Sequence, residues 1–208
     1  MLLLAKLCEV ATYIDVWVSC AHSIIERKSM ENSVDWSLAH PLHDVEDIVE
    51  MADGFGGEVE GILTTSRGIF RKNVTMTSAY QQFDRSREFL AVARPGGEYS
   101  DKLLGFCWFD RGGYTTYSTE EISNAKFHHV DLVLPVKTRV RLINAMIDQH
   151  ILWAYQNGVP VVCSTSIRGD HRGFMKIHEK RGFTVNGSYG WIRTKDGLNG
   201  IKGINLTN

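Results

Sequence analysis

The order of structural elements in this chain is decided by residues 127–183, which read FHHVDLVLPVKTRVRLINAMIDQHILWAYQNGVPVVCSTSIRGDHRGFMKIHEKRGF. Val130–Leu134 is almost continuously apolar, and it is followed by Pro135, which cannot donate to a sheet ladder. The pattern predicts a strand that stops at the proline and a helix that begins just after it.

A helix is predicted over Thr138–Gln156, because apolar residues recur there at intervals of three and four. Asn157-Gly158 supplies the left-handed residue that ends many helices, and Pro160 prevents continuation. We expect the inward face of this helix to consist of Val140, Ile143, Ile147, Ile151 and Ala154.

Val159–Cys163 is short, apolar and β-branched, which predicts a strand buried on both faces. A strand, a helix and a strand in this order imply a right-handed parallel crossover. A second helix is predicted over 171–180, closed by Gly182, and a last strand over 184–194.

The residues before this stretch predict antiparallel strands and helices of the same domain. Val34–Ala39 alternates like a strand, and Asp44 is the N-cap of a helix with aliphatic residues over 45–51. Neighbouring antiparallel strands are predicted over 89–93 and 102–109. The other assignments are a helical piece over 58–72, no defined element over 73–87 and a polar insert over 115–125.

Composition narrows the class of protein. The net charge of -1 over 208 residues disfavours a general nucleic-acid binder, which needs a basic excess to neutralise phosphates. The four cysteines lack the spacing of a metal knuckle, so we expect reduced thiols in a cytoplasmic compartment. His128 and His129 are adjacent strand residues that face opposite sides, so no metal site is predicted.

The first 29 residues form a separate unit in this interpretation. Lys6, Glu9 and Asp15 interrupt the apolar start, so neither a signal peptide nor a membrane span is expected. Apolar residues over 4–25 instead follow a heptad-like stripe of an amphipathic helix, which packs on the chain's own core or forms a homo-oligomer or assembly contact. The domain proper is expected over 30–195, followed by a flexible tail over 196–208.

Three motifs together resemble the GNAT superfamily of acyl-CoA-dependent N-acyltransferases, over roughly residues 34–194. They are His178–Phe183, which is similar to the family's ending of its last main helix, Asp131–Pro135, similar to its fourth strand, and Asp44–Met51, similar to its first helix. The resemblance implies an α/β (α+β) fold with a mixed central sheet and flanking helices, here with an extra N-terminal helix. It also implies acetyl-CoA as co-substrate and a small-molecule or protein amine as acceptor.

The chain departs from the family pattern in the turn that wraps the CoA pyrophosphate. Arg141 and Ile143 stand where the family has small residues, and a side chain there obstructs close approach of the backbone. His178 replaces the family's tyrosine acid. With these departures from the family pattern, the chain resembles internal virion or assembly proteins of T7-like podophages. That resemblance would place the protein in a host cytoplasm or virion. The alternative to an enzyme is therefore a catalytically inactive structural or assembly protein.

The site residues follow from these motifs. Lys137, Arg139 and Arg141 gather at a helix N-terminus, where a phosphate would offset their unfavourable interaction with the helix dipole; the alternative is a solvated basic helix end. We expect the sheet to open beyond Leu134 and leave a slot for the thioester carrier. The resemblance implies cofactor contacts from Val133, Leu134, Lys137, Thr138, Arg139, Val140, Arg141, Leu142, Ile143 and His171.

Three residues are candidates for proton transfer. His129 and Asp131 share one strand face by period-two alternation, so either is a candidate base. His178 is the candidate acid, since imidazole titrates near neutral pH. Each has an ordinary structural alternative, as a strand histidine, a capping carboxylate or a helix residue.

Overall fold

The computed structural model describes residues 34–59, 64–96, 102–166 and 172–185. The predicted N-terminal helix over 1–29, the tail over 196–208 and nearly all of the last predicted strand lie outside these ranges. No helix within the described ranges has the length and apolar character to cross a bilayer.

A five-stranded mixed sheet forms the centre of the domain, with its strands in chain order. The first three pairings are antiparallel, and the fourth is parallel. The parallel pairing of β4 with β5 confirms that the predicted connection is parallel. The strands are β1 (Val34–Leu38), β2 (Glu88–Pro95), β3 (Gly105–Gly113), β4 (Ile122–Val130) and β5 (Val161–Cys163).

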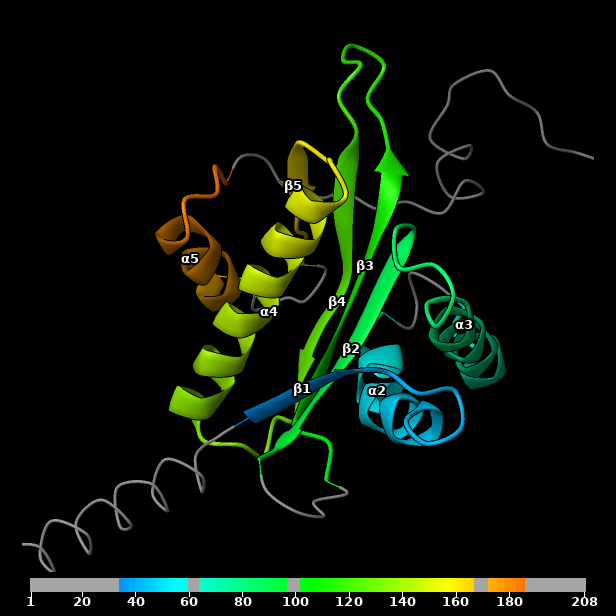
Figure 1. Cartoon of the computed structure of the whole chain (residues 1–208). Helices are drawn as coiled ribbons and strands as arrows, with labels where there is room; N and C mark the ends of the chain where they lie inside the picture. The colour runs from blue at the N-terminus through cyan, green and yellow to red at the C-terminus, as the bar shows by residue number, and fades with distance from the viewer. Residues whose placement is uncertain (1–33, 60–63, 97–101, 167–171, 186–208) are drawn as a thin grey trace, which may run out of the picture.

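Helices cover both faces of the sheet (Figure 1). The helices α4 (Val136–Gln156) and α5 (Arg172–Lys180) lie on one face, and α2 (Val45–Val59) and α3 (Arg67–Tyr80) lie on the other. Each face has its own apolar core, one built around Phe109 and Met146 and the other around Phe106 and Ile48. Burial on both faces explains the long apolar runs of β2 and β3.

The predicted inward face of the long helix is only partly right. Ile143, Ile147 and Ala154 are buried, whereas Val140 and Ile151 are 40% and 39% exposed. The face is rotated because Phe109, at the centre of the sheet, stacks on His150 with 4.1 Å between ring centroids. The remaining buried residues of the helix are Leu142, Met146, His150 and Trp153.

The predicted strand up to Pro135 is wrong in its last part, because β4 ends at Val130. The Asp131 carboxylate accepts a hydrogen bond from Val133 N at 2.9 Å, and Leu134 N donates to the Asp131 carbonyl at 3.2 Å. Such a side-chain bond favours a turn over a ladder. Leu132 and Val133 consequently point into solvent.

Three further assignments are corrected. The helical piece predicted over 58–72 only overlaps α3, which begins at Arg67 and continues to Tyr80, into the stretch for which no element was predicted. The helix begins after Ser66, whose hydroxyl accepts a hydrogen bond from Ile69 N at 3.3 Å. The predicted polar insert contains the first residues of β4, and the strand predicted over Val159–Cys163 is shorter and only half-buried.

Candidate functional site

β4 is paired with β5 along only the first part of its length. β5 pairs with Ile122–Asn124 only, although β4 continues to Val130. The sheet therefore opens at Ala125, not beyond Leu134 as the sequence suggested. An open parallel edge of this kind is a common place for ligands.

A groove runs along this open edge, between β4, the start of α4 and α5. We call it the β4 groove, and its volume is about 450 Å³. Its walls include both faces of β4 because it follows the strand's edge. Among the lining residues are His128, His129, Arg139, Ile143, Gly173 and Phe174.

A β-bulge in β4 lies at one end of the β4 groove. Trp108 is opposite Phe127 and Phe109 is opposite Ala125, so Lys126 has no opposite residue in β3. A bulge re-aims side chains and interrupts the ladder, and bulges are frequent next to active sites.

A second hollow lies on the face of the sheet covered by α3, with a volume of about 830 Å³. We call it the aromatic hollow, since Phe70, Trp108 and Phe127 form its wall. Lys126 and Phe127 line both the aromatic hollow and the β4 groove. The bulge therefore contributes side chains to the lining of both cavities.

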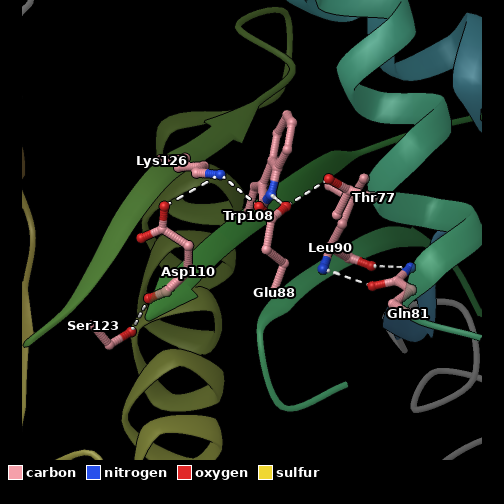
Figure 2. A network of polar contacts seen from close by, with 8 residues as sticks. All are labelled: Thr77, Gln81, Glu88, Leu90, Trp108, Asp110, Ser123 and Lys126. Carbon is pink, nitrogen blue, oxygen red and sulfur yellow. Dashed lines mark hydrogen bonds and ion pairs between the residues drawn. The ribbon is translucent and has the colours of Figure 1, made fainter. Parts of the chain in front are cut away.

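Glu88 organises the polar part of the aromatic hollow (Figure 2). Its carboxylate accepts hydrogen bonds from Thr77 Oγ1 at 2.5 Å, Trp108 Nε1 at 3.0 Å and Lys126 Nζ at 3.0 Å. Burial raises the pKa of Glu88, but these hydrogen bonds outweigh it and hold the pKa below its usual value. Lys126 Nζ also lies 3.2 Å from Asp110 and 4.8 Å from the Trp108 ring centre.

The start of α4 offers backbone donors and positive charge. Pro135 at the N-cap makes no side-chain cap, and the first turn holds no acidic residue. The first helical hydrogen bond is Arg139 N to Pro135 O at 3.0 Å, which leaves earlier N–H groups available to an acceptor. The buried Nε of Arg139, in the wall of the β4 groove, has no acceptor among the described residues. These features suit an anion.

The predicted cofactor residues take four kinds of position. Arg139, Val140 and Ile143 line the β4 groove, and Ile143 belongs to its inner wall without closing it. Leu142 is 1% exposed and packs in the core. His171 lies outside the described ranges. Like Leu142, the remaining residues do not line the groove; they are Val133, Leu134, Lys137, Thr138 and Arg141.

The structure does not bring the three proton-transfer candidates together. His129 lines the β4 groove and stacks on Phe106 with 5.4 Å between ring centroids. Asp131 lies in the turn after β4, where its carboxylate binds Val133 N and pairs with Lys102 at 3.3 Å. His129 and Asp131 do not share a strand face because the chain leaves the strand after Val130.

His178 is buried behind the groove. Its Nδ1 donates to the Phe174 carbonyl at 3.0 Å, because a carbonyl only accepts, and its Nε2 has no partner among the described residues. Burial lowers its pKa.

His128 is a site residue that was not among the candidates predicted from the sequence for proton transfer. It lines the β4 groove, and its ring lies 5.9 Å from that of His178 and 6.0 Å from that of His150. Burial lowers its pKa well below 6.5, and the neighbouring imidazoles add to the shift. His128 differs from an ordinary strand histidine only because it follows the point at which β5 stops pairing with β4. That point depends on tertiary structure and cannot be found from the sequence. Within the ranges the structure covers, no three metal-ligating side chains are arranged to hold an ion.

Comparisons with known proteins support the architecture. No family model matches the sequence, and no curated protein matches it. Solved acetyltransferase structures do match. A predicted acetyltransferase of Clostridium acetobutylicum, solved with acetyl-CoA, superposes with a TM-score of 0.56 at 12% identity, covering 79% of this chain and 98% of that one.

Two further structures agree. A possible acetyltransferase of Clostridium difficile has a TM-score of 0.54 at 11% identity, covering 77% of this chain and 96% of that one. Glucosamine-6-phosphate N-acetyltransferase of Arabidopsis thaliana has a TM-score of 0.52 at 13% identity, covering 78% and 98%. The protein therefore has the GNAT-like acyl-CoA N-acyltransferase fold, as the sequence resemblance implied.

Proposed function

We propose that the protein is an acyl-CoA-dependent N-acyltransferase that uses acetyl-CoA as its co-substrate. The observation that carries the proposal is the β-bulge at Lys126 and Phe127, two residues that line both a groove suited to an acyl carrier and a second cavity. A transfer reaction needs two substrates whose reacting atoms meet at one point. The shared fold supports the same reading.

The pyrophosphate of the co-substrate is assigned to the start of α4. Uncapped backbone N–H groups and the guanidinium of Arg139 supply donors there, with Lys137 and Arg141 as outer charges. Side-chain donors compensate for the glycines that the turn lacks. The pantetheine arm then follows the β4 groove, past Val140 and Ile143, towards the bulge.

The chemistry requires the acceptor nitrogen to lose a proton, attack the thioester carbon and expel the CoA thiolate, so that a C–N bond replaces a C–S bond. His128 and His129 line the β4 groove next to the bulge, where the pantetheine arm would end. A neutral imidazole there can accept the proton. His178 stands behind His128 and can take part only through it or through a water. Asp131 binds Val133 N and Lys102, so in this scheme it supports the turn after β4 and does not transfer the proton itself.

The second candidate function is structural. Arg141 and Ile143 replace the small residues of the phosphate turn, which favours a GNAT-fold assembly protein without catalysis. In that case residues 4–25 would be the natural contact segment, and the phage-particle role implied by the podophage resemblance would apply.

Isothermal titration with acetyl-CoA separates the two functions. The enzyme requires binding in the micromolar range, and Arg139→Ala should weaken it about tenfold or more, since a charge-assisted hydrogen bond contributes roughly 1.5–3 kcal/mol. Arg141→Ala, which removes an exposed charge outside the groove, should weaken binding less. Absence of heat at millimolar acetyl-CoA would rule out the enzyme and leave the structural role.

A further inference from the structure

The aromatic hollow is larger than the β4 groove and has no role in holding the acyl carrier. Its wall is formed by three rings in mutual contact, with centroid distances of 6.3 Å for Phe70 to Trp108, 5.5 Å for Phe70 to Phe127 and 6.1 Å for Trp108 to Phe127. A concave, mostly apolar surface with a few polar groups is the usual form of a small-molecule site.

The rim of the hollow is also apolar. Phe83, Tyr80 and Met76 line it and are 92%, 67% and 43% exposed. Large, solvent-exposed apolar side chains around a cavity indicate a surface that a bound molecule covers. The ligand for this site therefore has a substantial apolar or aromatic body.

The polar end of the hollow already holds an ammonium group. Lys126 Nζ lies between Glu88 and Asp110, above the face of Trp108. A carboxylate beside an aromatic face is the environment in which a primary ammonium is stabilised. Asp84 adds a second carboxylate to the lining, and Arg87 is the other cation there.

We propose that the aromatic hollow is the acceptor site and that the acceptor is a primary amine carried on an aromatic or aliphatic body. The ammonium group would lie beside Glu88 and share it with Lys126, while the body would lie against Phe70 and Trp108 and under Phe83. The assignment rests on the proposed function, because an acyl transfer is what requires two substrate sites side by side, as the shared lining residues Lys126 and Phe127 would provide.

Binding of the amine can be measured without any acyl transfer. Phenethylamine, 2-phenylethanol and glucosamine would be titrated into the full chain; the first has both ring and ammonium, the second lacks the charge and the third lacks the apolar body. We expect phenethylamine to bind at least about tenfold more tightly than either of the others. Equal binding of 2-phenylethanol, or tighter binding of glucosamine, would overturn the assignment.

Two substitutions locate the site. Phe83→Ser should weaken phenethylamine binding about three- to tenfold, whereas Tyr117→Ser should leave it unchanged, since Tyr117 is 89% exposed and lies outside the hollow. Glu88→Gln should weaken it about tenfold. Glu88 also binds Thr77 and Trp108, so Glu88→Gln could unfold the protein. In that case the comparison of Phe83→Ser with Tyr117→Ser tests the location of the site. An unchanged affinity in Phe83→Ser would place the amine elsewhere.

Thiol release from acetyl-CoA distinguishes failure of this inference from failure of the proposed function. Release that phenethylamine accelerates supports both. Acetyl-CoA binding with transfer to glucosamine alone would reject the apolar acceptor and keep the enzyme. Selective phenethylamine binding without acetyl-CoA binding would support the amine site and reject the transferase.

Discussion

Ser123 and His150 are hydrogen-bonded inside the core, with 2.7 Å between Ser123 Oγ and His150 Nε2. The same hydroxyl lies 2.8 Å from the Asp110 carbonyl, to which it must donate because a carbonyl only accepts. Ser123 therefore accepts from His150 Nε2–H. The other ring nitrogen of His150 carries a bare lone pair and has no partner within the described chain.

This arrangement predicts loss of stability in mild acid. Burial lowers the pKa of His150 to about 3, lowers that of His178 and lowers that of His128 well below 6.5. Their unfolded-state pKa is about 6.5, so the stabilisation is fully present above that pH and declines as the pH falls towards the folded-state values. Urea midpoints should fall steeply between pH 6.5 and 5, where carboxylates contribute little.

His150→Phe tests the assignment of this effect. Phe can keep the stack on Phe109, and removal of one titrating imidazole should reduce the pH slope by about 1.4 kcal/mol per pH unit below pH 6. Ser123 keeps its acceptor at Asp110. An unchanged slope would show that other groups cause the acid loss.

Gln81 joins α3 to the sheet and should be intolerant of an apolar replacement. Its amide donates to Ala39 O at 2.9 Å and Leu90 O at 3.0 Å and accepts from Leu90 N at 2.9 Å (Figure 2 shows the Leu90 bonds). Gln81→Leu leaves the buried Leu90 N without a partner and removes one of the two hydrogen bonds at each carbonyl, since Leu90 O also accepts from Ala39 N and Ala39 O from Gln82 Nε2. Chemical denaturation should therefore show a loss of about 2 kcal/mol or more.

Gln82→Leu is the matched control for Gln81. Gln82 is exposed, and its bonds to Ala39 O and Ser78 O measure 3.4 and 3.1 Å. Its replacement should cost less than about 1 kcal/mol. Equal losses at the two positions would contradict the role given to Gln81.

The sequence predicted best where structure is decided locally. Pro135 and Asn157-Gly158 delimit α4 through backbone geometry alone, so its ends were found to within two residues. The strand predicted up to Leu134 was wrong after Val130. The apolar residues after Asp131 resemble a strand, but the Asp131 carboxylate holds the chain in a turn. Local chemistry there overrode the hydrophobic pattern.

The elements that were missed or misplaced depend on partners distant in sequence. α3 presents Thr77 and Ser78 to the interior, and these polar residues hide its helical period. Thr77 is satisfied by Glu88, eleven residues further on, which no local pattern indicates. The same holds for the candidate site: the groove exists because β5 is short, and His128 gains its environment from α4 and α5.

Filling the β4 groove should block the co-substrate without loss of stability. Gly173 lines the groove on α5, and a Cβ there would meet no heavy atom within 4 Å. Gly173→Leu should stabilise the helix by up to about 1 kcal/mol while reducing acetyl-CoA affinity at least about tenfold by calorimetry.

Gly68→Leu provides the comparison. Gly68 is also the second residue of its helix, after Arg67, but it lines neither cavity. Its substitution should leave acetyl-CoA binding unchanged. Equal binding by the two variants would show that the β4 groove is not the carrier site.

Gly105 should be intolerant even of alanine. A Cβ at this first residue of β3 would stand 2.6 Å from the His129 carbonyl oxygen and 2.9 Å from Met146 Cε. The carbonyl cannot move without displacing β4, so Gly105→Ala should cost about 1–3 kcal/mol in thermal or urea unfolding. A loss below about 0.5 kcal/mol would contradict the tight contact between β3 and β4.

The most direct test of the central claim is a crystal structure of the full chain grown with acetyl-CoA. We predict the pyrophosphate at the first turn of α4 against Arg139, the pantetheine arm along the open edge of β4, and the acetyl group beside Lys126 and Phe127. Acetyl-CoA bound anywhere else, or a β4 groove that stays empty at saturating acetyl-CoA, would contradict this prediction.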